Sequence, residues 1–125
     1  MSGKKHIIII DNDKTFTALI KKFLEDKCSF DVKVVPDGYN GIITAKKTPP
    51  DLIILDVRMP AMNGLEILKK LKSENETASI PVIVFTGFND DEIRDKAFAL
   101  KAADYLVKPL DLEVLCERIT AALKN

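Results

Sequence analysis

Residues 51–56 have the sequence D-L-I-I-L-D, in which four apolar residues stand between two acids. Successive side chains of a β-strand point to opposite faces of the sheet, so a strand that is apolar throughout must be covered on both faces. Such strands are typical of parallel sheets, because the helices that connect parallel strands cover both sides. The stretch therefore predicts a buried parallel strand that ends at Asp56.

Four further short apolar runs lie around this strand. They are His6–Ile10, Asp31–Val35, Val82–Phe85 and Tyr105–Val107. The segments between them carry apolar residues at helical spacing, and Asp13, Asn89 and Asp111 stand where helix N-caps are expected, with Glu92 placed to complete a capping box with Asn89. Strand and helix alternate five times, which predicts a doubly wound, flavodoxin-like α/β fold. It has a five-stranded parallel sheet of order 2-1-3-4-5 and five helices on both faces.

Length and composition favour one small globular domain. The chain has 125 residues, of which 46% are hydrophobic and 30% are charged. We therefore expect residues 1–125 to form a single domain, with no output domain in this chain. The 19 basic and 19 acidic residues cancel, which argues against direct nucleic-acid binding as the main task.

The sequence also predicts a cellular location. No apolar run reaches the roughly 18 residues that span a bilayer, and the first residues lack a signal peptide. We expect a cytoplasmic protein without a membrane partner. In that compartment thiols stay reduced, so we expect Cys28 and Cys116 to be two reduced thiols in or near the core.

Polar residues that suit a phosphoryl-transfer site follow four of the strands. In an open parallel sheet, ligands bind at the carboxyl ends of the strands, where the strand order reverses. Asp11 and Asp56 would face each other there, and Thr86 and Lys108 follow the next two strands. Two carboxylates about 4 Å apart repel by around 4 kcal/mol at an effective dielectric of 20, so we expect a cation between them. Oxygen ligands without His or Cys favour Mg²⁺, and the lysine and hydroxyl suit a phosphate.

Three segments resemble the signatures of the receiver domain of two-component response regulators, of the chemotaxis-regulator-like kind. They are D-L-I-I-L-D-V-R-M-P-A-M-N-G-L-E at 51–66, V-I-V-F-T-G at 82–87 and Y-L-V-K-P at 105–109. They occur in the family's order and spacing, and the resemblance covers about residues 5–124. The resemblance implies a phosphorylation-dependent signalling switch.

The resemblance implies a role for each residue around the acceptor. Asp56 is expected to take a phosphoryl group from a sensor histidine kinase or a phosphotransfer protein. The expected Mg²⁺ ligands are Asp11, Asn12, Asp56 and the backbone carbonyl of Arg58. Most receivers have a second acid where this chain has Asn12, so we expect weaker metal binding and less repulsion in the metal-free state.

The later signatures imply the phosphoryl-binding and switch residues. Thr86, Gly87 and Lys108 are expected to bind the phosphoryl group, and Tyr105 to turn inward as Thr86 moves toward it. Arg58 and Phe88 would border the path of the hydrolytic water, so we expect them to lengthen the lifetime of the phosphate.

The expected output is a change in the face formed by the fourth helix, the fifth strand and the fifth helix. That face carries Arg94, Asp104, Glu113 and Arg118, which resemble part of the charged set that some regulators use to dimerise. We expect a downstream target of unknown identity, or a phosphorylation-dependent homodimer. The protein would be a phosphoryl recipient and not an enzyme, with at most weak self-dephosphorylation.

Two alternatives remain open on the sequence. I-I-I-I-D-N-D-K-T at 7–15 also resembles the first motif of haloacid-dehalogenase-type phosphatases, with Asp11 as nucleophile and Asp13 as general acid. The other alternative is an interaction module that no longer accepts phosphate, which Asn12 suggests.

Overall fold

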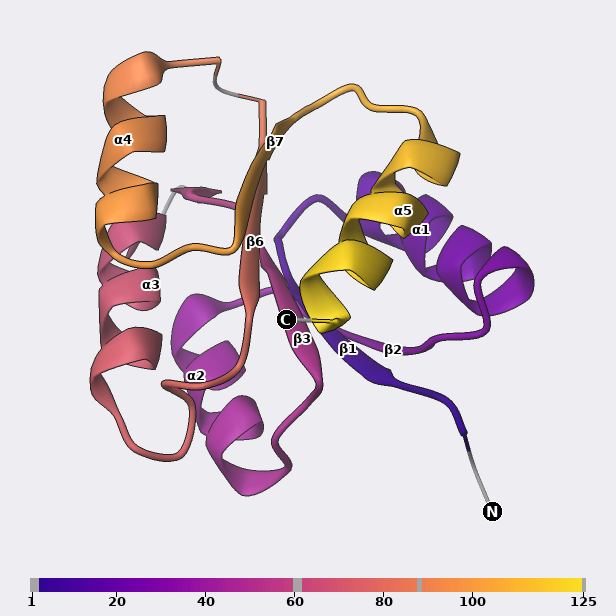
Figure 1. Cartoon of the computed structure of the whole chain (residues 1–125), viewed down its shortest axis with the longest axis horizontal. Helices are drawn as coiled ribbons and strands as arrows, with labels where there is room; N and C mark the ends of the chain where they lie inside the picture. The colour runs from indigo at the N-terminus through magenta and orange to yellow at the C-terminus, as the bar shows by residue number, and fades with distance from the viewer. Residues whose placement is uncertain (1–2, 60–61, 88, 125) are drawn as a thin grey trace.

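The computed structural model describes residues 3–59, 62–87 and 89–124 (Figure 1). Its strands and helices alternate along the chain except at β3, β4 and β5, which follow one another. In chain order they are β1 His6–Ile10, α1 Lys14–Lys27, β2 Asp31–Val35, α2 Gly38–Lys47, β3 Leu52–Leu55, β4 Arg58–Met59, β5 Met62–Asn63, α3 Gly64–Ser73, β6 Val82–Thr86, α4 Asp91–Ala99, β7 Asp104–Val107 and α5 Leu112–Leu123. Of these helices, none is both long and apolar enough to cross a membrane.

Five of the strands form one parallel sheet in the order β2-β1-β3-β6-β7. This is the predicted order 2-1-3-4-5, and the predicted fold class is confirmed. The strands lie within one residue of their predicted bounds. The antiparallel pair β4–β5 was not predicted, because a strand of two residues is too short to show a period of two.

The sheet separates two hydrophobic cores. Alternate residues of β1 enter different cores: Ile7 and Ile9 pack with α1 and α5, while Ile8 and Ile10 pack with α2 and α3. Figure 1 shows α1 and α5 on one side of the sheet and α2, α3 and α4 on the other. Every residue of β3 and β6 is buried, as expected for central parallel strands covered on both faces.

The N-cap of α4 differs from the prediction. Asp90, and not Asn89, caps the helix: its Oδ1 accepts hydrogen bonds from the backbone N–H groups of Glu92 and Ile93 at 2.9 and 3.3 Å. The helix begins one residue later than expected, so the predicted capping box of Asn89 and Glu92 is wrong. Asn and Asp are about equally good N-caps, so residue type could not distinguish the two positions.

The prediction of two reduced thiols is also wrong. Cys28, at the C-terminal end of α1, forms a disulfide with Cys116 of α5. The two residues are 88 positions apart in sequence, but the fold brings their Cα atoms to 6.5 Å. Sequence spacing alone cannot show that proximity.

Side chains of α1 cover the free edge of β2. Lys21 Nζ donates a hydrogen bond to the carbonyl oxygen of Val32 at 2.6 Å, and the N–H of Val32 donates to Glu25 Oε2 at 3.3 Å. Lys21 and Glu25 also pair with each other at 2.8 Å. The outward backbone groups of Val32, the second residue of this edge strand, are therefore occupied by their own chain.

Lys101 ends α4 in a conformation that favours glycine. Its φ is 71°, its N–H donates to Phe98 O at 2.9 Å, and the N–H of Ala102 donates to Ala97 O at 3.0 Å. This is the Schellman arrangement with Lys101 at its left-handed position, where a Cβ atom is unfavourable.

We therefore expect Lys101→Gly to raise the free energy of unfolding by about 1 kcal/mol, measured by urea denaturation. The Lys101 side chain is exposed, so little packing is lost. Lys101→Ala is the matched control, because alanine removes the long side chain but keeps Cβ. Equal stabilities of the two variants would contradict this explanation.

Candidate functional site

The strand register places Asp11 beside Asp56. Ile10 of β1 is paired with Leu55 of β3, so the next residue of each strand reaches the same carboxyl edge of the sheet. The N–H of Asp56 donates to Ile10 O at 3.0 Å. Both carboxylates are buried, with Asp11 3% and Asp56 7% exposed. The structure thus brings together the two acids that the sequence predicted to converge.

Lys108 lies between these two acids. Its N–H donates to Thr86 O at 2.7 Å, which fixes the end of β7 against the end of β6. Its Nζ donates to Asp11 Oδ2 at 2.8 Å and to Asp56 Oδ2 at 3.3 Å. The positive charge expected between the carboxylates is therefore, in this structure, the lysine ammonium. One ammonium group thus contacts both acids.

Two aromatic rings lie against the ammonium group of Lys108. Nζ of Lys108 lies 3.9 Å from the centroid of the Phe16 ring and 5.9 Å from that of Phe85. The rings themselves meet edge to face, with centroids 5.4 Å apart. A cation over an aromatic face is attracted by the ring quadrupole. Phe16 was not among the site residues predicted from the sequence. Its position in the first turn after Asp13 was the available signal.

The predicted switch residues lie around this cluster. Thr86 is fully buried at the end of β6, and Gly87 is exposed directly after it. Tyr105 is only 9% exposed and packs in the core under α2, α3 and α4. Burial raises the pKa of its hydroxyl, and the nearby Asp90 carboxylate raises it further. The ring therefore already occupies an inward position, and its movement stays a prediction.

The remaining predicted residues are less enclosed. Asn12 is exposed beside Asp11. Asp13 turns away from the site, because its Oδ1 accepts the N–H of Phe16 at 3.0 Å as the N-cap of α1. Arg58 is in β4, but its side chain lies outside the described part. Phe88 lies outside the described residues altogether.

The donor set suits a hard cation. Within the described ranges, no three His, Cys, Asp or Glu side chains cluster as a metal centre. A metal here would rely on the carboxylates of Asp11 and Asp56, completed by amide, carbonyl or water oxygens. Such all-oxygen coordination is typical of Mg²⁺, which keeps several of its waters.

Burial raises the pKa of the Asp11 carboxyl above its ordinary value. The hydrogen bonds from Lys108 Nζ and from the N–H of Asp13 oppose this shift without cancelling it. Asp11 therefore binds its proton more tightly in the folded protein than in the unfolded chain, and the stability that this gives is present at low pH and lost as pH rises through the folded pKa.

At pH 7 without metal, we therefore expect Asp11→Asn to be more stable than the wild type. The difference should shrink as pH falls from the raised pKa toward the ordinary value near 3.9. Urea unfolding in EDTA between pH 4 and 7 measures it. Asp13→Asn is the control, because an exposed N-cap tolerates asparagine. A stability difference that does not change with pH would contradict the assignment to Asp11.

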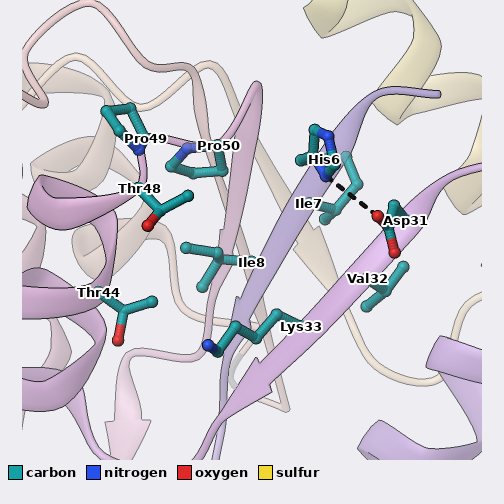
Figure 2. Close-up of a pocket in the computed structure, with 10 residues that line it drawn as sticks. All are labelled: His6, Ile7, Ile8, Asp31, Val32, Lys33, Thr44, Thr48, Pro49 and Pro50. Carbon is teal, nitrogen blue, oxygen red and sulfur yellow. Dashed lines mark ion pairs between the residues drawn. The ribbon is translucent and has the colours of Figure 1, made fainter. Parts of the chain in front are cut away.

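A separate cavity of about 320 Å³ lies at the opposite ends of the strands (Figure 2). It opens between β1, β2 and the end of α2, with Ile8 and Lys33 among its lining residues. His6 Nδ1 and Asp31 Oδ2 pair at its rim, 3.2 Å apart. Because β1 runs away from it toward Asp11, the cavity is not part of the acidic site.

Comparison with known proteins agrees with this geometry. The model of the response regulator receiver domain matches residues 7–120. The chain belongs to that family. A receiver domain is a phosphorylation-dependent signalling switch of two-component systems, and receiver domains act with histidine kinases and downstream effectors.

Individual relatives match this chain over different shares of their own length. Protein PilH of Pseudomonas aeruginosa is 34% identical, with 94% of this chain and 96% of PilH aligned. The DNA-binding dual master transcriptional regulator RpaA of Synechocystis is 35% identical over 95% of this chain, which spans only 49% of RpaA. The chain thus matches nearly all of one relative and about half of the other.

A solved receiver domain shares the fold. The receiver domain of the sensor histidine kinase PA1611 of P. aeruginosa superposes with a TM-score of 0.88 over 98% of this chain and 100% of that one, at 20% identity. That structure has a magnesium ion coordinated in its active-site cleft. At this identity the likeness supports the fold alone.

Proposed function

We propose that Asp56 is the phosphoacceptor of this receiver domain, and that the donor is a phosphohistidine of a sensor histidine kinase or phosphotransfer protein. An Asp56 carboxylate oxygen attacks phosphorus, the N–P bond of the donor breaks, and the histidine nitrogen leaves with its electron pair. The product is an acyl phosphate on Asp56. The observation that carries the proposal is the Lys108 ammonium held against Asp56 and Asp11, because the same cation can neutralise a phosphoryl oxygen.

The residues around Asp56 fit Mg²⁺. Asp11, Asp56, the Asn12 side chain and the Arg58 carbonyl would hold it, as hard oxygen donors. When bound, the ion supplies charge neutralisation for the phosphoryl group. Asn12→Asp adds a charge, so it is expected to tighten Mg²⁺ binding.

The side chains of this chain have distinct parts in the step. Phe16 and Phe85 hold Lys108 in place, and its Nζ moves from the carboxylates to the transferred group. Thr86 and Gly87, at the end of β6, offer a hydroxyl and an N–H to the phosphoryl oxygens. Thr86 then draws Tyr105 with it. Arg58 and Phe88 slow hydrolysis, which a double alanine variant with a shorter phosphate lifetime would support.

The output is assigned to the face of α4, β7 and α5. On it Arg118 forms a two-pronged ion pair with Asp104, with both N···O distances 2.7 Å, while Arg94 pairs with Asp91 at 3.1 Å. A homodimer or a downstream target that uses these charges would have to share or replace those pairs. We place this action in the cytoplasm, with the protein as a phosphoryl recipient and not an enzyme.

Mass spectrometry after incubation with acetyl phosphate and Mg²⁺ tests the acceptor. We expect one phosphoryl group on wild type and none on Asp56→Asn. Asp51→Asn is the control, because Asp51 lies at the other end of β3, where its Oδ2 accepts the His6 N–H.

Two outcomes would overturn the proposal. Label on Asp11 would support a phosphatase, although Asp13, its required general acid, caps α1. No label, and no effect of beryllofluoride on Tyr105 fluorescence or on sedimentation, would indicate an interaction module.

A further inference from the structure

The disulfide between Cys28 and Cys116 joins the two helices that cover one face of the sheet. Cys28 follows the last residue of α1, and Cys116 lies in the second turn of α5. Both side chains pack against the rim of the core beneath these helices and are only half-buried. The bond therefore lies at the edge of this core and not inside it.

An open groove gives access to the disulfide. Its volume is about 430 Å³, and Phe23, Lys27 and Glu113 line it together with the two cysteines. Thiol–disulfide exchange requires that a thiolate reach one of the two sulfur atoms. The groove provides that approach from solvent, which distinguishes this bond from a disulfide enclosed in a core.

We propose that Cys28 and Cys116 form a reversible thiol–disulfide modification site, whose reaction partner is a dithiol or its disulfide. In reduction, a partner thiolate attacks one sulfur, the Cys28–Cys116 bond breaks, and the other cysteine leaves as a thiolate, which gives a mixed disulfide. The second partner thiol then attacks the partner sulfur of this mixed disulfide and releases the remaining cysteine thiol. Two cysteine thiols form and the partner leaves as a disulfide, so two electrons and two protons pass to the chain; oxidation is the reverse. Where disulfides occur in cytosolic proteins, they are usually of this exchangeable kind.

The site acts on α5 and not on the acidic cluster. The 14 residues of α1 separate Cys28 from the Asp11 end of the sheet by about 20 Å at 1.5 Å per residue. α5, by contrast, carries Arg118, the partner of Asp104. Oxidation therefore ties α5 to α1 and restrains one side of the face formed by α4, β7 and α5. This role goes beyond phosphoryl acceptance and needs neither Mg²⁺ nor a phosphoryl donor.

A redox titration of the full chain tests the proposal. The protein is equilibrated in mixtures of reduced and oxidised dithiothreitol. Its free thiols are then alkylated, and the number of labelled cysteines is determined by mass spectrometry. Without denaturant, we expect one reversible transition, from two labelled cysteines in the reduced form to none in the oxidised form. Because the bond closes a loop of 88 residues, the oxidised form should melt about 10 °C higher. Amide exchange in residues 112–123 should be slower in that form.

Under reducing and oxidising conditions alike, the variants Cys28→Ser and Cys116→Ser should each have the melting temperature and amide exchange of the reduced wild type. Should either fail to fold, the oxidised and reduced forms of the wild type still provide the comparison. Three results would overturn the proposal. The cysteines could still react with the alkylating agent after equilibration in oxidised dithiothreitol, the disulfide could be reduced only after the protein unfolds, or a non-reducing gel could show a cross-link between two chains.

Discussion

Lys108→Met is expected to lower the metal-free free energy of unfolding by about 3 kcal/mol at pH 7. The variant keeps an unbranched apolar chain over Phe16 but removes the ammonium group that contacts both Asp11 and Asp56. Two buried carboxylates would then lose the positive charge that pairs with both of them. Urea denaturation in EDTA measures the loss.

Added Mg²⁺ should restore much of this stability in the variant, because a divalent cation can replace the ammonium between the carboxylates. Lys22→Met is the matched control: Lys22 also pairs with an acid, Asp26 at 2.9 Å, but on the exposed surface of α1. No measurable change is expected there. A Lys108→Met variant as stable as the wild type in EDTA would show that the lysine does not hold the acids together.

Gly64→Ala is expected to destabilise the fold by about 3 kcal/mol and to impair phosphorylation. Gly64 is the first residue of α3, and its N–H donates to Val57 O at 3.2 Å. A Cβ at this position would overlap Val57 Cα and lie 2.8 Å from its carbonyl carbon. Val57 directly follows Asp56, so the backbone that must move is the one that positions the proposed acceptor.

The cause at Gly64 is lack of space and not backbone conformation, since its φ is not positive. Gly87→Ala is the control for stability, because a Cβ there would meet no atom within 4 Å. Thermal denaturation compares the two variants, and acetyl phosphate labelling then tests Gly64→Ala. Equal melting temperatures of the two variants would rule out the steric explanation.

The sequence predicted the parts of the site that follow from strand order. Once β1 and β3 are assigned as neighbouring parallel strands, the acids after Ile10 and Leu55 must meet at one edge. The pattern of apolar residues is enough to assign these strands, because a short continuous apolar run identifies a buried strand.

Side-chain partners could not be predicted in the same way. Lys108 was expected to bind an anion, but it also pairs with both acids. The contact of Lys108 with the Phe16 ring and the Cys28–Cys116 bond each join segments that are distant in sequence. These contacts depend on how helices pack across the sheet, which the local pattern of α1 or α5 does not contain.

The cover that Lys21 and Glu25 place on Val32 has a consequence for behaviour at high concentration. An extended segment of a second molecule has no vacant backbone groups to bond at that position. The cover therefore hinders the addition of a further strand at this position of the β2 edge, which is the kind of contact that builds fibrils. Lys21→Ala removes the donor to the Val32 carbonyl, so we expect this variant to aggregate more readily at high concentration, as light scattering would measure.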